Sequence, residues 1–269
     1  MPYRQAHWFV LAIFPLAALA FWPGYLAQFS TSPIQMHLHG VTATLWLALL
    51  AGQSWTIHHG DRNRHRLLGW ASLALFPLFL AGGAGIFLGM ARHYDEASSP
   101  FYTLYAPRLA WIDVVSVLAF AAFYHEGLRL RRHTQLHARY LLATALFLLP
   151  PILGRLAPLL PPLAIEGPQD FWKLGIAFQL GNGVSVAIAL ALAATSGRHA
   201  RPFLLAAGAV LLAALLFQFA GSMAWWLQLL TRLASVPPTA LSLVAAVAGA
   251  GIAFSGWTTG EPRERRAVA

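Results

Sequence analysis

Two short motifs place a histidine and an arginine at the start of long apolar runs. One reads HRLLGWASLALFP over 65–77, and the other reads HARYLLATALFLLP over 137–150. Neutral imidazole is a good ligand for metal ions and haem iron, whereas arginine beside an apolar run typically anchors anionic lipid headgroups. The arginines therefore have a topological explanation, and the histidines are the candidates for chemistry.

Histidines gather in the same polar segments as these motifs. The members are His58, His59, His65, His125, His133, His137 and His199. We take His65 and His137 as the preferred ligand pair for a haem b, because two neutral imidazoles from two helices at one depth suit a six-coordinate haem. His125 and His39 are further cofactor-binding candidates. His133 and His137 are four residues apart, which is a metal-ligand spacing if that stretch is helical. The alternative is that no cofactor binds and the histidines are interface residues.

Two ionisable residues fall inside apolar runs. Asp113 lies within one run and Arg155 near the end of the next, at a matching depth. A carboxylate in a membrane span is costly and usually has a partner. We expect an intramembrane Asp113–Arg155 pair that clamps two helices, and the alternative is a site for a proton or a substrate.

The composition is that of a membrane protein. The chain is 58% hydrophobic and 10% charged, against about 25% charged in soluble domains. It contains no cysteine, which excludes disulfides, thiolate metal sites and a cysteine nucleophile. The formal net charge is +9, but the arginines sit in short gaps between apolar runs, so we expect no nucleic-acid partner.

The apolar runs predict an all-α polytopic bundle of about eight transmembrane helices. The expected spans are 8–28, 36–57, 66–90, 108–128, 137–158, 172–195, 203–229 and 234–258. The last two are separated only by TRLASVPPT, so seven spans are the alternative. We interpret the first run as a membrane helix rather than a cleaved signal peptide, because it continues through Phe21 and Trp22. The whole chain, 1–269, then forms a single membrane domain.

Lysine and arginine predict the orientation. The side opposite the N-terminus would hold only Arg92, Arg108, Arg155, Lys173 and Arg232 of the 18 basic residues. The remainder fall on the N-terminal side, Arg263, Arg265 and Arg266 among them. By the positive-inside rule that side is cytoplasmic, which places both termini inside.

The segment 36–158 reads as two similar hairpins. In each, a helix ends in a turn rich in histidine and arginine, and the next helix begins with His65 or with His137. Such a repeat would make these two histidines equivalent positions facing a common centre. Three further spans follow over 172–258.

The same segment resembles a family of uncharacterised bacterial multi-span membrane proteins. The matching positions are His39, Gly40, Trp46, Gln53, His65, Arg66, Gly69, Asp113, His137, Arg139, Ala143, Thr144 and Arg155. The resemblance covers roughly residues 36–158. It implies a bacterial inner-membrane protein, and the family is distantly similar to membrane proteins proposed to act in haem handling or oxidase assembly.

Three functions are compatible with these residues. The first is binding of haem b or a metal for electron transfer or for haem and oxidase assembly, in contact with a respiratory complex. The second is transport of a small solute or proton through Asp113, Arg155 and intramembrane amides. The third is an accessory subunit of a larger membrane complex. No catalytic constellation decides whether the protein is an enzyme.

Overall fold

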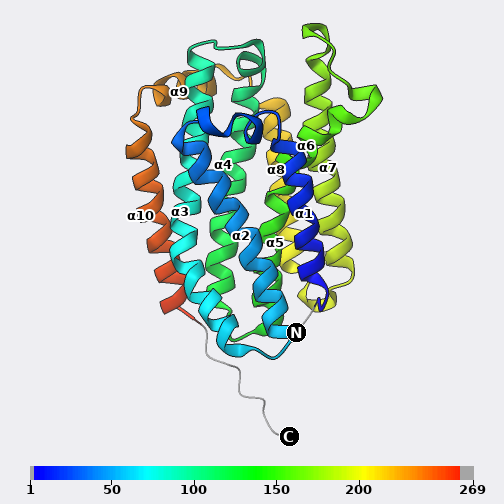
Figure 1. Cartoon of the computed structure of the whole chain (residues 1–269), viewed down its shortest axis with the longest axis vertical. Coiled ribbons are helices and arrows are strands. Elements are labelled where there is room, and N and C mark those ends of the chain that lie inside the picture. Colours follow the sequence, from blue (N-terminus) through cyan, green and yellow to red (C-terminus); the bar gives the residue numbers. More distant parts are fainter. Residues whose placement is uncertain (1–2, 261–269) are drawn as a thin grey trace, which may run out of the picture.

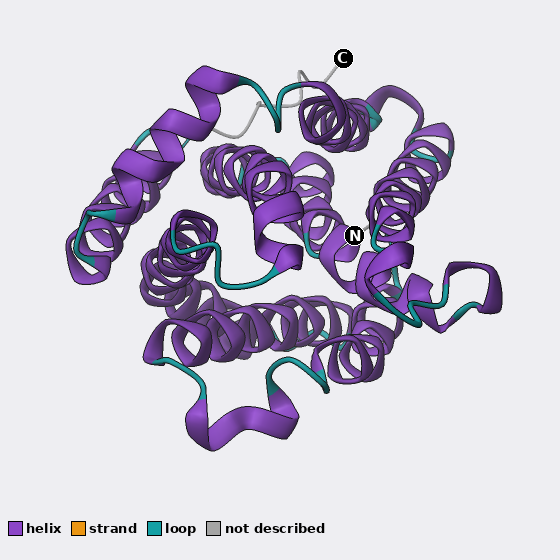
Figure 2. Cartoon of the chain, turned by 90° about the horizontal axis from the view of Figure 1, so that it is seen from above, coloured by secondary structure: helices purple, strands orange, loops and turns teal. Residues whose placement is uncertain are grey.

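The chain folds into a bundle of helices. The computed structural model describes residues 3–260 and contains, within that range, ten α-helices, six short 3₁₀ helices and no β-strand (Figure 1). Seen along the bundle, the helices are joined by loops and turns (Figure 2). This confirms the predicted all-α class. Arg263, Arg265 and Arg266, which contributed to the predicted orientation, lie outside the described residues.

Within residues 3–260, seven helical segments are long and apolar enough to cross a membrane. They are α2 (Ile34–His58), α3 (Arg62–Asp95), α4 (Pro100–Arg129), the broken segment Thr134–Leu159, α7 (Trp172–Ala194), α8 (Arg201–Phe219) and α10 (Pro238–Thr258). Each overlaps one of the predicted spans. Their apolar side chains suit contact with lipid. A helix also satisfies its own backbone hydrogen bonds, which lipid cannot do.

The first predicted span is shorter than expected. Helix α1 covers Ala6–Phe21, and Pro23 and Gly24 follow its end. Its 16 residues correspond to about 24 Å of rise, against roughly 30 Å for a hydrocarbon core. After a turn and a 3₁₀ helix, η1 (Leu26–Thr31), the chain enters α2, against which α1 packs.

The predicted span 203–229 is wrong at its C-terminal end. Helix α8 stops at Phe219, and a separate helix, α9 (Ala224–Ala234), follows. Gly221 lies against the Arg108 side chain of α4, so close that a Cβ there would be 2.5 Å from Arg108 Cγ. Helix α9 buries Trp226 and Leu230 on its inner face and lies at the upper end of the bundle in Figure 1.

The fifth predicted span is broken into three pieces. Helix α5 (Thr134–Ala143) passes into the 3₁₀ helix η2 (Thr144–Phe147) and then into α6 (Leu149–Leu156), which continues into η3 (Ala157–Leu159). Pro150 and Pro151 explain the break, because neither can donate the backbone hydrogen bond that a continuous α-helix needs. The 3₁₀ helices η4 (Pro161–Leu163) and η5 (Pro168–Asp170) then lead to α7.

The turns between helices lie at two opposite ends of the bundle. The α2–α3 and α4–α5 turns and the α7–α8 turn, which contains η6 (Gly197–His199), lie at the lower end in Figure 1, near both ends of the described chain. We call this the N-terminal end. The α3–α4 turn, the 157–171 segment and α9 lie at the opposite end.

Aromatic rings form the centre of the bundle. Trp46 of α2 is fully buried and its ring centre lies 4.9 Å from that of Phe120 and 5.3 Å from that of Tyr124. The indole Nε1 of Trp46 donates a hydrogen bond of 3.0 Å to Thr144 Oγ1 in the broken segment. These contacts join α2, α4 and the broken segment at the centre of the bundle.

Candidate functional site

A cavity of about 340 Å³ opens among the helices toward the N-terminal end. Its walls come from α2, α3, α4, α5, α10 and the α4–α5 turn. The lining residues are Trp46, Leu49, Leu50, Gln53, His65, Arg66, Gly69, Trp70, Ser72, Tyr124, Leu128, Arg131, His137, Leu141 and Trp257. A cavity of this size, largely apolar with a few polar groups, is typical of small-molecule sites between helices.

His65 and His137 both line this cavity, and they hold equivalent local positions. The Nδ1 atom of His65 lies 3.3 Å from the carbonyl oxygen of Gln53, near the end of the preceding helix. The Nδ1 atom of His137 lies 2.7 Å from the carbonyl oxygen of Gly127, near the end of its own preceding helix. A carbonyl fixes the proton on Nδ1 and leaves Nε2 with a free lone pair. Neither Nε2 has a hydrogen-bond partner among the described residues.

Two arginines contribute positive charge to the same walls. Arg66 is exposed beside His65, and Arg131 stacks its guanidinium 4.6 Å from the ring centre of Trp257. Arg131 also donates to the carbonyl of Leu128 at 3.2 Å. Burial, and then the charge of Arg132, lower the pKa of Arg131 from its usual value. An arginine remains charged in any case, so the cavity suits a ligand with an anionic group.

A hydroxyl pair closes the inner wall. Tyr124 Oη and Ser72 Oγ lie 2.9 Å apart, and Ser72 Oγ also donates to the carbonyl of Gly69 at 2.6 Å. The pair ties α4 to α3 within the cavity wall. The polar atoms of this wall are thus held in place by the protein before any ligand binds.

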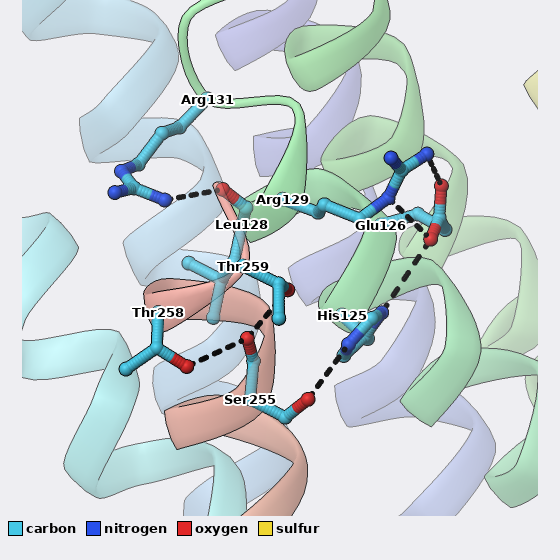
Figure 3. A network of polar contacts seen from close by, with 8 residues as sticks. All are labelled: His125, Glu126, Leu128, Arg129, Arg131, Ser255, Thr258 and Thr259. Atoms are coloured by element: carbon cyan, nitrogen blue, oxygen red, sulfur yellow. Dashed lines mark hydrogen bonds and ion pairs between the residues drawn. The ribbon is translucent and has the colours of Figure 1, made fainter. Parts of the chain in front are cut away.

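The structure places the other two haem-ligand candidates away from this cavity. His125 faces α10, where its Nε2 lies 3.4 Å from Ser255 Oγ and its Nδ1 lies 3.4 Å from Glu126 Oε1 (Figure 3). His39 lies near the opposite end of α2 and stacks on Phe79, with ring centres 5.7 Å apart. Helix geometry explains the first result, since His125 is about 100° around α4 from Tyr124.

The proposed His133–His137 metal pair does not form part of a larger ligand group. His133 is the residue before α5 rather than a residue within it. Within residues 3–260 there is no group of three or more histidine, cysteine, aspartate and glutamate side chains that could hold a metal ion.

Asp113 and Arg155 do not form the direct ion pair that their depths suggested. The described residues contain no salt bridge between them, and Asp113 Oδ2 is buried without a hydrogen-bond partner. The Nη1 atom of Arg155 donates instead to the carbonyl of Pro151 at 3.0 Å, and the guanidinium lies 4.7 Å from the ring centre of Phe21. The intramembrane amides act as interhelical contacts: Gln179 Nε2 donates to the carbonyl of Ala214 at 3.0 Å.

Sequence reasoning missed part of the cavity wall. Tyr124 was passed over for its neighbour His125, although Phe120, Tyr124 and Leu128 are spaced four residues apart and share one face of α4. Arg66 and Arg131 were explained by topology alone. Trp257 comes from the last helix, and no local pattern connects it to the histidines.

Comparison with known proteins gives no relative from which to transfer a role. No family model, no curated protein and no solved structure matches the chain. The function must therefore be argued from the cavity itself.

Proposed function

We propose that this chain is an integral membrane protein that binds haem b in the cavity, where His65 and His137 would hold the iron. One observation carries the proposal. The two imidazoles come from separate helices, line one cavity, and each holds its Nδ1 against a backbone carbonyl. This is the arrangement in which both Nε2 atoms are available as ligands.

The residues around the histidines fit a haem better than a bare metal ion. A haem supplies four nitrogen ligands itself, so two imidazoles are sufficient. Trp46, Trp70 and Trp257 offer aromatic surface for a flat macrocycle. Arg66 and Arg131 would pair with carboxylate groups at its edge. When bound, the haem would supply one-electron chemistry, and the chain's residues would fix its orientation and limit the access of water.

The same proposal gives a location and an orientation. The N-terminal end carries most of the arginines, so we place it in the cytoplasm and the helices in a bacterial inner membrane. The cavity would then face the cytoplasm. An electron-transfer or haem-delivery role would require a partner in the same membrane, such as a respiratory complex.

The test is an absorption spectrum of the full-length protein. The protein is made in haem-sufficient cells, purified in mild detergent and measured in the oxidised and dithionite-reduced states. We expect a Soret band and a sharp reduced α-band. His65→Ala and His137→Ala should each remove the low-spin spectrum, because each removes one axial ligand.

His59→Ala is the matched control. His59 is exposed at the same end, stacks on Trp55 with ring centres 4.5 Å apart, and lies outside the cavity wall. Its replacement should leave the spectrum unchanged. A featureless spectrum of the wild-type protein, with no iron by elemental analysis, would overturn the proposal.

A further inference from the structure

A smaller cavity adjoins the one that we assign to haem. It has a volume of about 40 Å³, and its walls come from α2, α3 and α5. Gln53, Ser54 and His58 of α2 line it, together with apolar side chains. Gln53, His65 and His137 line both cavities, so the two adjoin each other. The haem proposal makes no use of Ser54 or His58.

Three buried polar atoms on the wall of this smaller cavity lack a partner. Gln53 Oε1, Ser54 Oγ and His58 Nε2 have no hydrogen bond to any described residue. Ser54 as a whole is only 8% exposed. Ser54 and His58 are four residues apart and share one face of α2, and Gln53 is the residue beside them. Buried polar atoms in folded proteins almost always have a partner, which is often an ordered water molecule.

The hydrogen bonds already present decide what the three open atoms can offer. Gln53 Nε2 donates to the carbonyl of His65 at 3.1 Å, which leaves Gln53 Oε1 as an acceptor. His58 Nδ1 lies 2.7 Å from the carbonyl oxygen of Ser54, so the neutral ring carries its proton there and Nε2 is also an acceptor. Ser54 Oγ still has a hydrogen to donate. A ligand that completes this set must donate two hydrogen bonds and accept one.

We propose that Gln53, Ser54 and His58 form a binding site for an ordered water molecule. Its two hydrogens would go to Gln53 Oε1 and His58 Nε2, and its oxygen would accept from Ser54 Oγ. A water molecule needs about 10–15 Å³ of cavity space, so the volume is sufficient.

An ammonium ion is similar in size but fits these atoms less well. It has no lone pair to accept the hydrogen of Ser54 Oγ. Its charge would also be repelled by Arg66 and Arg131, which line the adjoining cavity. The donors, the acceptors and the local charge therefore all favour water.

This water would complete the bonding of a residue that positions His65. Gln53 contacts His65 twice: its Nε2 donates to the His65 carbonyl, and its own carbonyl oxygen lies 3.3 Å from His65 Nδ1. A hydrogen bond to Gln53 Oε1 would hold the amide in the orientation that the first contact needs. The water site is part of the support of His65, and it does not depend on whether haem binds.

The first test is a structure of the full-length protein, determined without added ammonium, at a resolution that shows ordered water. We expect one water at about 2.7–3.2 Å from each of Gln53 Oε1, Ser54 Oγ and His58 Nε2. This measurement uses the wild-type protein and does not depend on whether a variant folds. No water at that point, or direct hydrogen bonds among the three side chains, overturns the proposal.

The second test is hydroxyl-radical footprinting in detergent, in which radicals formed from bound water oxidise the side chains beside it. Ile57 is the reporter, because it lines the smaller cavity and not the larger one. Ser54→Ala removes the donor to the water and should lower the oxidation of Ile57 several-fold. Ser185→Ala is the matched control, since Ser185 is buried on α7 and its Oγ donates to the carbonyl of Gly181 at 2.8 Å. It should leave Ile57 unchanged, and equal oxidation of Ile57 in all three proteins contradicts the site.

A salt exchange separates water from ammonium. Replacing sodium chloride by ammonium chloride should leave the thermal unfolding temperature of the wild-type protein unchanged. A rise that is specific to ammonium, and that Ser54→Ala abolishes, would assign the site to the ion and overturn the proposal for water.

Discussion

At the scale of single residues, His65 and His137 can have two roles, and the two are separable. Each Nδ1 forms a hydrogen bond with a backbone carbonyl of the preceding helix, and this bond holds the two helices of the hairpin together. Neither Nε2 has a hydrogen-bond partner among the described residues, and both side chains line the cavity. An asparagine amide can replace the Nδ1 hydrogen bond but cannot replace the Nε2 ligand.

We therefore expect His137→Asn to keep most of the stability and to lose the haem spectrum. His137→Ala should lose both, with an additional cost of about 0.5–1.5 kcal/mol for the hydrogen bond to Gly127. Thermal unfolding and absorption spectra of the two variants make the comparison. If both variants keep the low-spin spectrum, His137 serves only in the hydrogen bond to the preceding helix and is not a ligand.

At the scale of helices, close crossings depend on individual glycines. A Cβ at Gly181 of α7 would lie 2.7 Å from the carbonyl oxygen of Pro150 and 2.9 Å from the amide nitrogen of Gly154. Gly183, two residues later, is exposed, and a Cβ there meets nothing within 4 Å. The two positions share a helix and a residue type but differ in their surroundings.

We expect Gly181→Ala to lower the stability by about 1–3 kcal/mol, because α6 and α7 would have to move apart. Gly183→Ala should be neutral or slightly stabilising, since alanine is the better helix former by up to about 1 kcal/mol. Denaturant unfolding in detergent gives both values. Equal effects at the two positions would contradict the crossing seen here.

The segment before α7 is held by an ion pair and hydrogen bonds whose contribution to stability depends on pH. Lys173 Nζ lies 2.8 Å from Asp170 Oδ1 and donates to the carbonyl of Ala164 at 3.0 Å, while the amide of Glu166 donates to Asp170 Oδ2 at 3.1 Å. The Lys173 ammonium, followed by the backbone amide of Glu166, lowers the pKa of the Asp170 carboxyl. The carboxylate is therefore the form that the folded segment prefers.

A lowered folded-state pKa means that the stabilisation is present above the unfolded-state value and is lost as the pH falls through the folded-state value. We expect Asp170→Asn to unfold at a slightly lower temperature than the wild-type protein near neutral pH. The difference should disappear in acid below the ordinary range of aspartate. A difference that is constant with pH would contradict this linkage.

At the scale of the whole molecule, the arrangement of turns predicts which positions lie on opposite sides of the membrane. The chain has no cysteine, so single cysteines can report it without a background. Asn63, near the start of α3, and Ser98, in the α3–α4 turn beyond its end, are both exposed.

With the N-terminal end in the cytoplasm, a membrane-impermeant maleimide should label Ser98→Cys on cells whose outer membrane is permeable. It should label Asn63→Cys only after the inner membrane is opened. The reverse result would invert the proposed orientation, and labelling of both in intact cells would exclude α3 as a membrane span.

The sequence by itself determined the class of fold and the position of seven long helices, because apolar runs and proline breaks are local signals. Tertiary structure decided which face of each helix is inside. A membrane helix is apolar all round, so its pattern does not distinguish the side toward lipid from the side toward neighbours. For this reason the pattern suggested His125 where Tyr124 lines the cavity, and it suggested a direct Asp113–Arg155 ion pair, whereas Arg155 donates to the carbonyl of Pro151 instead. His65 and His137 lie in one cavity because each is held by its Nδ1 against a carbonyl of its own preceding helix, and helices far apart in the sequence pack together around that cavity.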